Sequence, residues 1–377
     1  MQQRLKKALS CNRFSRYPSK NAFINFAFMS PTLPITEFLN ASRHMPVIDV
    51  RSPAEFAKGH IPGAHNIPLF SNEERAVIGT RYKRTGKDAA VLAGLEVVGP
   101  KLAAFVRDAQ SVAIEGKVLV HCWRGGMRSS SFAWLLNTAG LQATTLRNGY
   151  KAFRRFVLHS FEAPYTLVVL GGETGSGKTD ILRHLKAQGE QVIDLEGLAH
   201  HKGSSFGALG QAPQPGVETF ENFFSRELLL LDPSRRIWVE DESKSIGRVF
   251  IPDGFWKQMV EAPVIRVAVP KDARVARLVE EYGKFSVPEL EAAVERIQKR
   301  LGGLVYKQCI EALHSGDLAF VADLTLGYYD KAYNFNKERP VAGIIQMEGD
   351  DPAAAATQVI AWVNEHRLPV PAEPAKH

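Results

Sequence analysis

The sequence predicts an α/β protein with two domains, of which the second is built on a parallel β-sheet. Short runs of β-branched residues alternate with longer helical patterns along most of the chain, as in successive βα units. The length of 377 residues exceeds that of one ordinary domain and suits two. Pro164, followed by a second strand–loop–helix series, places the domain boundary at residues 160–165.

The first half of the chain is expected to hold three strands. They are predicted at Val47–Val50, Lys117–His121 and Ala143–Leu146, because each run is short, apolar and bounded by turn residues. A loop rich in Pro and Gly is predicted from the first strand to Pro68. Helical patterns are found at Asn72–Ile78, Asp88–Gln110 and Ser129–Thr138, and a further helix begins at Tyr150.

The second half repeats the alternation of strand and helix from Tyr165 onward. Its predicted strands are Thr166–Leu170, Gln191–Leu195, Arg236–Glu240, Pro263–Val269 and Ala342–Met347. Its predicted helices are Lys178–Ala187, Glu218–Leu230, Lys271–Tyr282, Pro288–Ala312 and Pro352–Glu365. Because helices connect the strands, a parallel sheet is expected here.

Most of the net positive charge lies in a short N-terminal extension. The formal net charge is +7, but residues 1–28 hold six basic residues and no acidic one, which leaves 41 basic and 40 acidic residues for the rest. Bulk charge therefore says little about partners. The extension suits a transit peptide or a nucleic-acid arm; we interpret residues 1–30 as a disordered extension or as sequence before a true start at Met29. A frayed tail is expected at 369–377.

The overall composition excludes several classes of protein. Apolar residues make up 45% and charged residues 23%, which excludes wholesale disorder. No run approaches about 18 consecutive apolar residues, so no membrane span is predicted. The three cysteines, Cys11, Cys122 and Cys309, cannot form a disulfide framework. A reducing, cytoplasmic location is therefore expected.

The first candidate site is a loop between the strand Lys117–His121 and a helix. Cys122 stands at the C-terminal end of the strand, where open α/β sheets place their chemistry. Gly125 and Gly126 allow successive N–H groups to point inward, and such a nest beside a helix N-terminus favours a thiolate and binds an oxyanion. Arg128 adds a cationic donor as oxyanion support. The pattern predicts a nucleophile rather than an inert buried cysteine.

The second candidate site is a Gly-rich turn between a strand and a helix. Its sequence satisfies Gly-x-x-x-x-Gly-Lys-Thr completely, a P-loop or Walker A motif. The backbone amides of such a loop surround a diphosphate, its Lys bridges the outer oxygens, and its Thr reaches a magnesium ion. The predicted diphosphate-binding residues are Gly172, Gly175, Ser176, Gly177, Lys178 and Thr179. The motif indicates a diphosphate and does not require that the ligand be a nucleotide.

An acidic cluster follows the third strand of the second half. Glu240 or Asp241 occupies a Walker-B-like place, where a carboxylate could hold the water shell of a magnesium ion. The alternative is an acidic strand end that caps the next turn. Magnesium is thus a possible ligand, no metal ligand is assigned, and no tightly bound cofactor is expected.

Two segments of the first half resemble the rhodanese signature, Asp49–Phe56 and Gly59–Pro68. The resemblance implies a rhodanese-like domain at residues 33–160, in which Asp49 and Arg51 support the cysteine loop. Five residues separate Cys122 from Arg128, one more than in ordinary sulfur-transferring rhodaneses. Rhodanese-related phosphatases also have this longer loop, which suits a tetrahedral oxyanion such as phosphate, thiophosphate or selenophosphate.

The fusion of this domain to a P-loop domain at residues 165–368 resembles bacterial tRNA 2-selenouridine synthase. Further similar segments are Glu74–Lys83, Asp194–Gly207, Val239–Gly247 and Tyr328–Asp330. The resemblance implies a transferase whose partner is a tRNA with 2-thiouridine at the wobble position. It implies that a geranyl group from geranyl diphosphate is first placed on the sulfur. Selenium from selenophosphate then replaces the S-geranyl group.

The same resemblance implies roles for particular residues. Cys122 would attack the selenium, carry it as S-selanylcysteine and deliver it to C2 of the uridine. Gly79 would serve the geranyl step, unless it is only a turn residue. A selenophosphate-supplying enzyme is the expected protein partner, and a membrane is not expected as a partner.

Contacts with tRNA and two other functions remain as alternatives. Two basic sets could contact phosphates, although each also fits a solvated face: Lys271, Arg274 and Arg277 on one predicted helix, and Arg81, Lys83, Arg84 and Lys87 near Gly79. One alternative function is a rhodanese-like sulfurtransferase or phosphatase fused to a nucleotide kinase. The other is a non-enzymatic nucleotide-sensing module, which the intact Cys122 and Lys178 disfavour.

Overall fold

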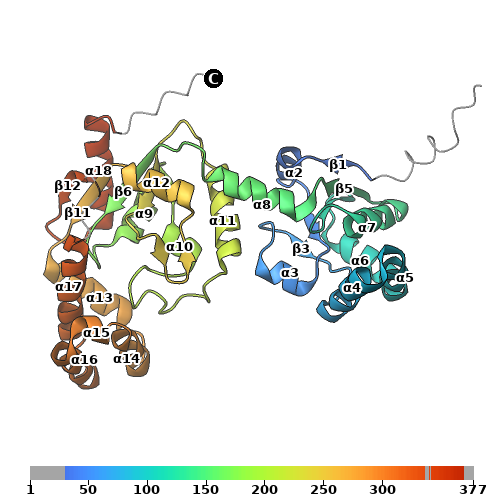
Figure 1. The fold of residues 1–377 in the computed structure, drawn as a ribbon. Coiled ribbons are helices and arrows are strands. Elements are labelled where there is room, and N and C mark those ends of the chain that lie inside the picture. Colours follow the sequence, from blue (N-terminus) through green and yellow to red (C-terminus); the bar gives the residue numbers. More distant parts are fainter. Residues whose placement is uncertain (1–29, 336–338, 340, 369–377) are drawn as a thin grey trace, which may run out of the picture. The chain divides into compact units, whose positions relative to one another are not determined.

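The computed structural model describes residues 30–335, 339 and 341–368. Its internal contacts divide the chain into two units, Met1–Phe153 and Arg154–His377, and each is an α/β unit (Figure 1). The helix α8 (Gly149–Ser160) crosses this division. The predicted N-terminal extension, apart from Ser30, and the predicted tail lie outside the described residues.

The first unit contains a parallel sheet of five strands. In spatial order they are β1 (Thr32–Leu33), β5 (Gln142–Leu146), β4 (Lys117–His121), β2 (Val47–Asp49) and β3 (His65–Asn66). The apolar residues Ile48, Val118 and Val120 of the central strands are buried, and Phe132 and Leu136 of helix α7 (Met127–Thr138) pack with them. The sheet confirms the predicted fold class and places the end of β4 near its middle.

The remaining helices of the first unit differ in part from the predicted ones. They are α2 (Ile35–Ala41), α3 (Pro53–Lys58), α4 (Asn72–Thr85), α5 (Lys87–Val98), the 3₁₀ turn η1 (Gly99–Lys101) and α6 (Leu102–Val112). The loop predicted up to Pro68 is wrong in part, because Ser52 and Glu55 form a capping box that starts α3. The single helix predicted at Asp88–Gln110 is interrupted at Gly99 and Pro100, since Pro lacks the N–H that continues a helix.

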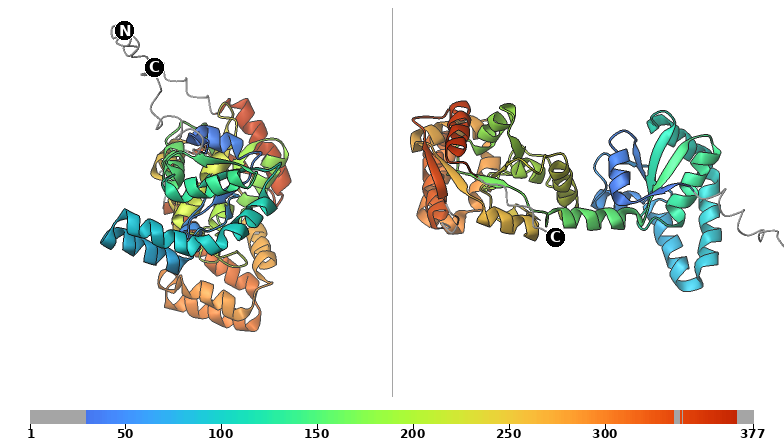
Figure 2. Two further views of the ribbon diagram at one scale, coloured as in Figure 1. Left: turned by 90° about the vertical axis from the view of Figure 1, so that its right-hand side faces the viewer. Right: turned by 90° about the horizontal axis from the view of Figure 1, so that it is seen from above.

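Helices α4 and α5 form an antiparallel pair that extends away from the sheet (Figure 2). No residue of α4 is buried, and Val77, Tyr82, Leu92 and Leu95 of the pair are exposed. The run Lys87–Val112, which joins α5 to α6, is long and apolar enough by length and composition alone to cross a membrane. One such run supports a membrane span only weakly, and the absence of a membrane partner stays a prediction.

The second unit contains another parallel sheet of five strands. Their order is β12 (Val341–Gln346), β11 (Val264–Ala268), β6 (Leu167–Gly171), β8 (Ile237–Glu240) and β7 (Gln191–Ile193). A short antiparallel pair, β9 (Ser245–Ile246) and β10 (Val249–Phe250), lies outside this sheet. The strands predicted in this half agree with the structure to within two residues at each end.

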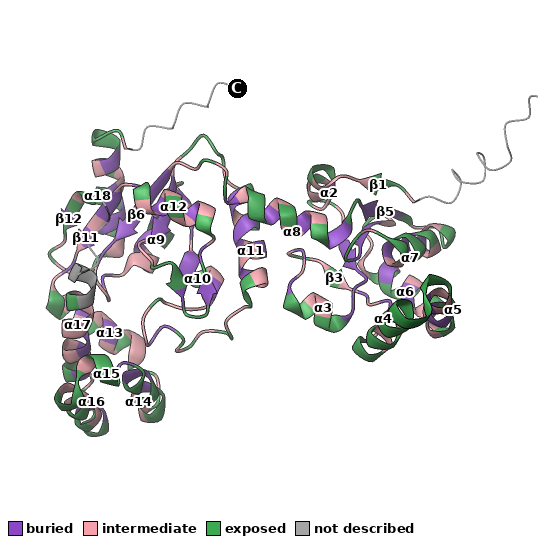
Figure 3. Cartoon of the chain, in the orientation of Figure 1, coloured by how far each residue is buried: buried purple, intermediate pink, exposed green. Residues whose placement is uncertain are grey.

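Helices flank this sheet, and the buried residues concentrate in its strands and the facing helix sides (Figure 3). They are α9 (Lys178–Ala187), α10 (Leu195–Ala199), α11 (Val217–Leu229), α12 (Asp253–Glu261), α13 (Lys271–Tyr282) and α18 (Pro352–Glu365). Helix α9 packs on β6, β7 and β8 and against α18. The second domain is therefore the predicted P-loop type of α/β unit, with α9 starting directly after the Gly-rich turn.

Four further helices surround an apolar cluster of their own. They are α14 (Val287–Glu295), α15 (Gln298–Leu301), α16 (Gly303–Ser315) and α17 (Leu318–Phe335). The single helix predicted at Pro288–Ala312 is wrong, because the chain leaves the helical path at Ile297 and at Gly302, whose φ is +82°. Helix α17 was not predicted, although it supplies Val321 and several partly buried residues to the cluster.

Candidate active sites

The Cys122 loop runs from the end of β4 to the start of α7. Cys122 is 3% exposed, so its thiol lies just beneath the surface. Its Sγ lies 3.2 Å from the Oγ of Ser129 and 3.9 Å from the carbonyl oxygen of Gly126. Trp123 and Arg124, the next two residues, are exposed. The structure thus places the predicted nucleophile at the carboxyl end of a central strand.

Two glycines allow the turn after β5 to pack directly on the Cys122 loop. Gly125 has a φ of +64°, and a Cβ there would lie 2.7 Å from the carbonyl oxygen of Leu146. Gly149 has a φ of +57°, and its Cβ would overlap the carbonyl oxygen of Cys122. The N–H of Tyr150 donates to that same carbonyl at 2.8 Å. Backbone contacts that only glycine permits therefore hold the loop in shape.

A buried ion pair supports the loop from below. The guanidinium of Arg51 binds both carboxylate oxygens of Asp49, at 3.0 and 2.6 Å, and also donates to the carbonyl of Gly59 at 2.7 Å. Burial raises the pKa of Asp49, but neighbouring His121 and Arg51 outweigh it and hold that pKa below its usual value. The guanidinium also stacks on the ring of Tyr150, 3.7 Å from its centre. These contacts bear out the internal support predicted for Asp49 and Arg51.

Arg128 is held by an acidic partner in this structure. Its Nη1 donates to Glu55 at 2.8 Å, and the Nε of Arg75 lies 3.6 Å from the same carboxylate. Burial raises the pKa of Glu55, but its bond to Arg128 outweighs this and holds the pKa below its usual value. Gly79 lies inside α4 rather than in a turn, and a Cβ there would lie 2.6 Å from the Nη1 of Arg75. Gly79 is thus linked through Arg75 and Glu55 to the Cys122 loop.

The Gly-rich turn adopts the shape of an anion-binding loop. Gly175 and Gly177 have φ values of +81° and +74°, which turn the backbone amides toward the cavity beside them. Ser176 also lines this cavity, and its Oγ is buried without a hydrogen-bond partner among the described residues. The loop therefore offers its backbone amides to an anion.

Lys178 and Arg274 fix the ends of this loop. The Nζ of Lys178 donates to the carbonyl oxygen of Gly172 at 2.9 Å, so the ammonium spans the mouth of the loop. Arg274, which is buried, donates to the carbonyl of Thr174 at 3.2 Å and pairs with Glu173 at 3.0 Å. Arg274 was a candidate for tRNA phosphates, but its burial makes it a support of the loop instead.

Two carboxylates that the sequence did not single out line the same cavity. The hydroxyl of Thr179 donates to Glu196 of α10 at 2.9 Å, and Glu242 faces the same space. Desolvation and the negative charge of Glu196 raise the pKa of Glu242 well above its usual value of 4.5. The cavity spans about 1710 Å³, including the part open to solvent. The P-loop residues, Lys178, Glu196 and Glu242 therefore all line one cavity.

The two predicted Walker-B-like residues lie in different surroundings. Glu240 is fully buried outside the cavity, where it accepts the N–H of Leu195 at 3.0 Å. Burial raises the pKa of Glu240 well above its usual value, and the charge of Asp194 adds to this. Asp241 does line the cavity, but it is paired with Arg339. Among the described residues no group of three or more His, Cys, Asp or Glu side chains could hold a metal ion.

The two basic sets differ in their surroundings. On α13, Lys271 and Arg277 pair with acidic residues at 2.6 and 2.7 Å, as Arg274 does. Across the α4–α5 turn, by contrast, four exposed residues have no ion-pair partner in the described part of the chain, namely Arg81, Lys83, Arg84 and Lys87. We call these four residues the basic tip. It is the set that remains available to a phosphate backbone.

Comparison with known proteins gives a match for each unit. A family model described as a rhodanese-like domain matches residues 35–156. A second family model, described as the tRNA 2-selenouridine synthase AAA domain, matches residues 165–368. The two matches follow one another along the chain, in the order of the two sheets described above.

Similarity to individual curated proteins extends through both units. The tRNA 2-selenouridine synthase of Sulfurovum sp. strain NBC37-1 is 34% identical over 357 residues, which cover 85% of this chain and 95% of that protein. The protein of the same name from Bordetella bronchiseptica is 36% identical, with 80% and 90% covered. That of Shewanella loihica is 33% identical, with 90% and 98% covered.

Proposed function

The chain belongs to the tRNA 2-selenouridine synthase family, and from that premise we propose that it exchanges sulfur for selenium at C2 of the wobble uridine, position 34, of tRNA. It is an enzyme, a transferase that acts on tRNA. One observation carries the proposal: both matched domains occur in a single chain, the first with Cys122 at the end of a central strand and the second with a complete P-loop.

We propose that the P-loop binds geranyl diphosphate. In the first step the sulfur of 2-thiouridine attacks C1 of the geranyl group, the C1–O bond breaks, diphosphate leaves and the base loses its N3 proton. The loop residues and Lys178 line one cavity, where the loop amides and the ammonium of Lys178 would stabilise the negative charge that builds on the leaving diphosphate. Such preorganised donors lower the barrier of the step that creates the charge.

A magnesium ion fits the same cavity. Thr179, Glu196 and Glu242 present oxygen atoms beside Lys178, and two carboxyl groups that share one region without a cation carry an unfavourable mutual repulsion. We propose that these three residues hold the ion when it accompanies the diphosphate. The ion would supply further charge stabilisation for the leaving group.

We propose that Cys122 acts in the transfer of selenium from the donor to the tRNA. In the net second step, selenophosphate and water give phosphate, selenium takes the place of the S-geranyl group at C2, and geranyl thiol leaves with no net oxidation. Alkylation makes the displacement feasible, because a thiol leaves more readily than sulfide. A separate selenophosphate-supplying enzyme would serve as the partner, and the chain would act in the cytoplasm.

The basic tip on α4 and α5 is our proposed contact with tRNA phosphates. Its four side chains are exposed and have no ion-pair partner in the described ranges, whereas the basic residues of α13 are paired. Gly79 lies on α4 near the start of this tip, which is consistent with a role of that helix in presenting the uridine.

A direct assay tests the whole proposal. The full chain is incubated with a tRNA that carries 2-thiouridine, with geranyl diphosphate, and with or without selenophosphate, and the nucleosides are analysed by mass. We expect S-geranylated uridine without selenophosphate and 2-selenouridine with it. The proposal is wrong if a tRNA that a known family member modifies gives neither product.

A further inference from the structure

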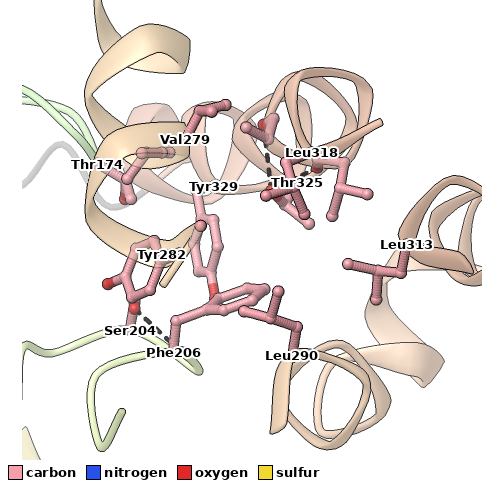
Figure 4. Close-up of a pocket in the computed structure, with 14 residues that line it drawn as sticks. Thr174, Ser204, Phe206, Val279, Tyr282, Leu290, Leu313, Leu318, Thr325 and Tyr329 are labelled. Carbon is pink, nitrogen blue, oxygen red and sulfur yellow. Dashed lines mark hydrogen bonds between the residues drawn. The ribbon is translucent and has the colours of Figure 1, made fainter. Parts of the chain in front are cut away.

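The helical part of the second unit encloses an apolar cavity beside the P-loop. We call it the tail pocket, and its walls are mainly apolar and aromatic side chains from α13, α14, α16 and α17 (Figure 4). They include Leu278, Tyr282, Leu290, Leu313, Leu318 and Tyr329. The space between these walls measures about 520 Å³, including its open mouth.

The tail pocket is continuous with the cavity that holds the P-loop. Thr174 of the loop, Ser204, Leu278, Tyr282 and Tyr329 line both spaces. In Figure 4, Thr174 and Ser204 lie at one side of the tail pocket, and Leu313 and Leu318 lie at the opposite side. A single ligand could therefore extend from the amides of the P-loop into the helical part of the unit.

The chemistry of the walls changes from polar to apolar along this path. The hydroxyl of Tyr329, near the mouth, accepts the N–H of Ser205 at 3.0 Å. Thr325 lies deeper, and its hydroxyl donates to the carbonyls of Val321 and Ala322 in its own helix, at 2.9 and 3.1 Å. Because these hydroxyls are already paired, the deep walls favour a hydrocarbon over a polar group.

We propose that the tail pocket binds the hydrocarbon chain of a prenyl diphosphate whose diphosphate lies on the P-loop. This inference rests on the proposed function and deepens it, because it assigns the residues that recognise the prenyl group. A nucleotide would present a polar base and ribose to the same walls, which offer them few free hydrogen-bond partners. The far wall, at Leu313 and Leu318, limits the length of the prenyl chain that the enzyme accepts.

Binding to the full chain without tRNA tests the pocket by itself. Calorimetry compares inorganic diphosphate with geranyl diphosphate, both with magnesium. Burial of the hydrocarbon chain should make geranyl diphosphate bind roughly 100-fold more tightly or better. Equal affinities for the two ligands would overturn the proposal. Since no transfer is measured, a failure of geranylation in the tRNA assay would count against the proposed function alone.

A matched pair of leucines on α17 tests where the hydrocarbon chain of the ligand binds. Both residues are partly buried against the same apolar cluster, but Leu318 lines the tail pocket and Leu324 does not. Leu318→Trp should weaken the binding of geranyl diphosphate by roughly tenfold or more, because the larger side chain fills the space for the hydrocarbon chain. The affinity for inorganic diphosphate should stay within about twofold. Leu324→Trp should change neither affinity by more than about twofold.

The opposite change tests the control of chain length. Leu318→Ala removes part of the far wall at a partly exposed position, so the fold should tolerate it. The variant should shift the preference from geranyl toward farnesyl diphosphate by about tenfold, measured as the ratio of their affinities, whereas Leu324→Ala should leave the ratio unchanged. If the Leu318 and Leu324 variants show the same affinities in both experiments, the tail pocket is not the binding site of the hydrocarbon chain.

Discussion

Cys122 has a close hydroxyl neighbour, Ser129, and a backbone carbonyl near its sulfur. Replacing the sulfur by oxygen in Cys122→Ser keeps this geometry but removes the nucleophilic thiolate that the proposed transfer of selenium needs. We expect selenation to fall by at least about 1000-fold while geranylation stays within about twofold. The mass analysis of nucleosides measures both products.

The second described cysteine provides the control for this prediction. Cys309 is fully buried in the apolar cluster of the helical part, away from either loop. Burial raises the pKa of its thiol, which keeps it unreactive. Cys309→Ala should retain both activities. Normal production of 2-selenouridine by Cys122→Ser would disprove the proposed role of Cys122 in selenium transfer.

The residues that could be predicted from the sequence are those whose chemistry lies in one continuous segment. Cys122 and the P-loop stand in short motifs, and the structure places both at the carboxyl ends of strands. Glu196 and Glu242 could not be found in this way, because folding brings them to Thr179 from separate parts of the chain. Spacing along the chain also pointed to Glu240, whose side chain turns into the interior.

At the scale of elements, α4 connects Gly79 with the Cys122 loop through side chains. A bulky residue at this position must displace Arg75, which contacts Glu55, the partner of Arg128. Gly79→Leu should therefore lower geranylation by about tenfold or more. The helix itself should persist, because Leu favours a helix over Gly by roughly 0.8 kcal/mol.

The neighbouring exposed residue gives the control. Thr80→Leu adds a similar side chain to the same helix on a solvent-exposed position. Circular dichroism and thermal unfolding should show both variants folded, and only Gly79→Leu should lose geranylation. Equal activities of the two variants would remove Gly79 from the geranyl step.

The basic tip joins two helices whose other contacts are few. Changing its four basic residues to Ala should weaken tRNA binding and reduce the slope of log affinity against log salt by up to about 4, since each phosphate contact releases roughly one counterion. A control that removes one exposed basic residue elsewhere, Lys299→Ala on α15, should leave the slope unchanged. Filter binding over a range of salt concentrations measures the slope, and an unchanged slope in the tip variant excludes this contact.

Predicted helices were reliable where an apolar face packs along a sheet or a neighbouring helix. Helices α9, α13 and α18 begin and end as predicted, and each has such a face. Helix α3 was missed because six residues are too few for a periodic pattern, although its capping box was visible in the sequence. Helix α12, which has nine residues, was missed as well.

At the scale of the whole molecule, the buried carboxyl groups should make the free energy of unfolding depend on pH. The pKa of Glu242 is raised in the folded state by desolvation and by Glu196, so folding binds its proton more tightly. This contribution to the free energy of unfolding is fully present below the pKa of Glu242 in the unfolded state, near 4.5. It is lost as the pH rises through the higher pKa of Glu242 in the folded state. The raised pKa of Glu240 likewise lowers the free energy of unfolding as the pH rises.

Glu242→Gln tests this sign. The variant should lose less stability than the original chain as the pH rises above about 4.5, because Gln keeps the neutral form at every pH. Glu280→Gln, at an exposed position of the cavity rim, is the control. Urea unfolding at several pH values gives the slopes, and parallel slopes for the original chain and Glu242→Gln would contradict the assignment.

The order of strands in both sheets lay beyond what the sequence pattern could predict. Alternation of strand and helix predicted a parallel sheet in the second domain, and the structure confirms this. The order β12-β11-β6-β8-β7 depends on which apolar faces pack together across long distances in the chain, and no local signal encodes it. The helical part that forms the tail pocket was likewise not foreseen as a separate layer.

Glu196 and Glu242 line the P-loop cavity together, and burial and the charge of Glu196 raise the pKa of Glu242. A divalent cation that enters between the two carboxyl groups favours their charged forms, so its binding should release protons to the buffer, whereas diphosphate without the cation should not. The calorimetric heat of magnesium–diphosphate binding should then differ between two buffers of unlike ionisation enthalpy, in proportion to the protons released. In Glu242→Gln the difference should vanish, and equal heats in the original chain would show that no proton leaves.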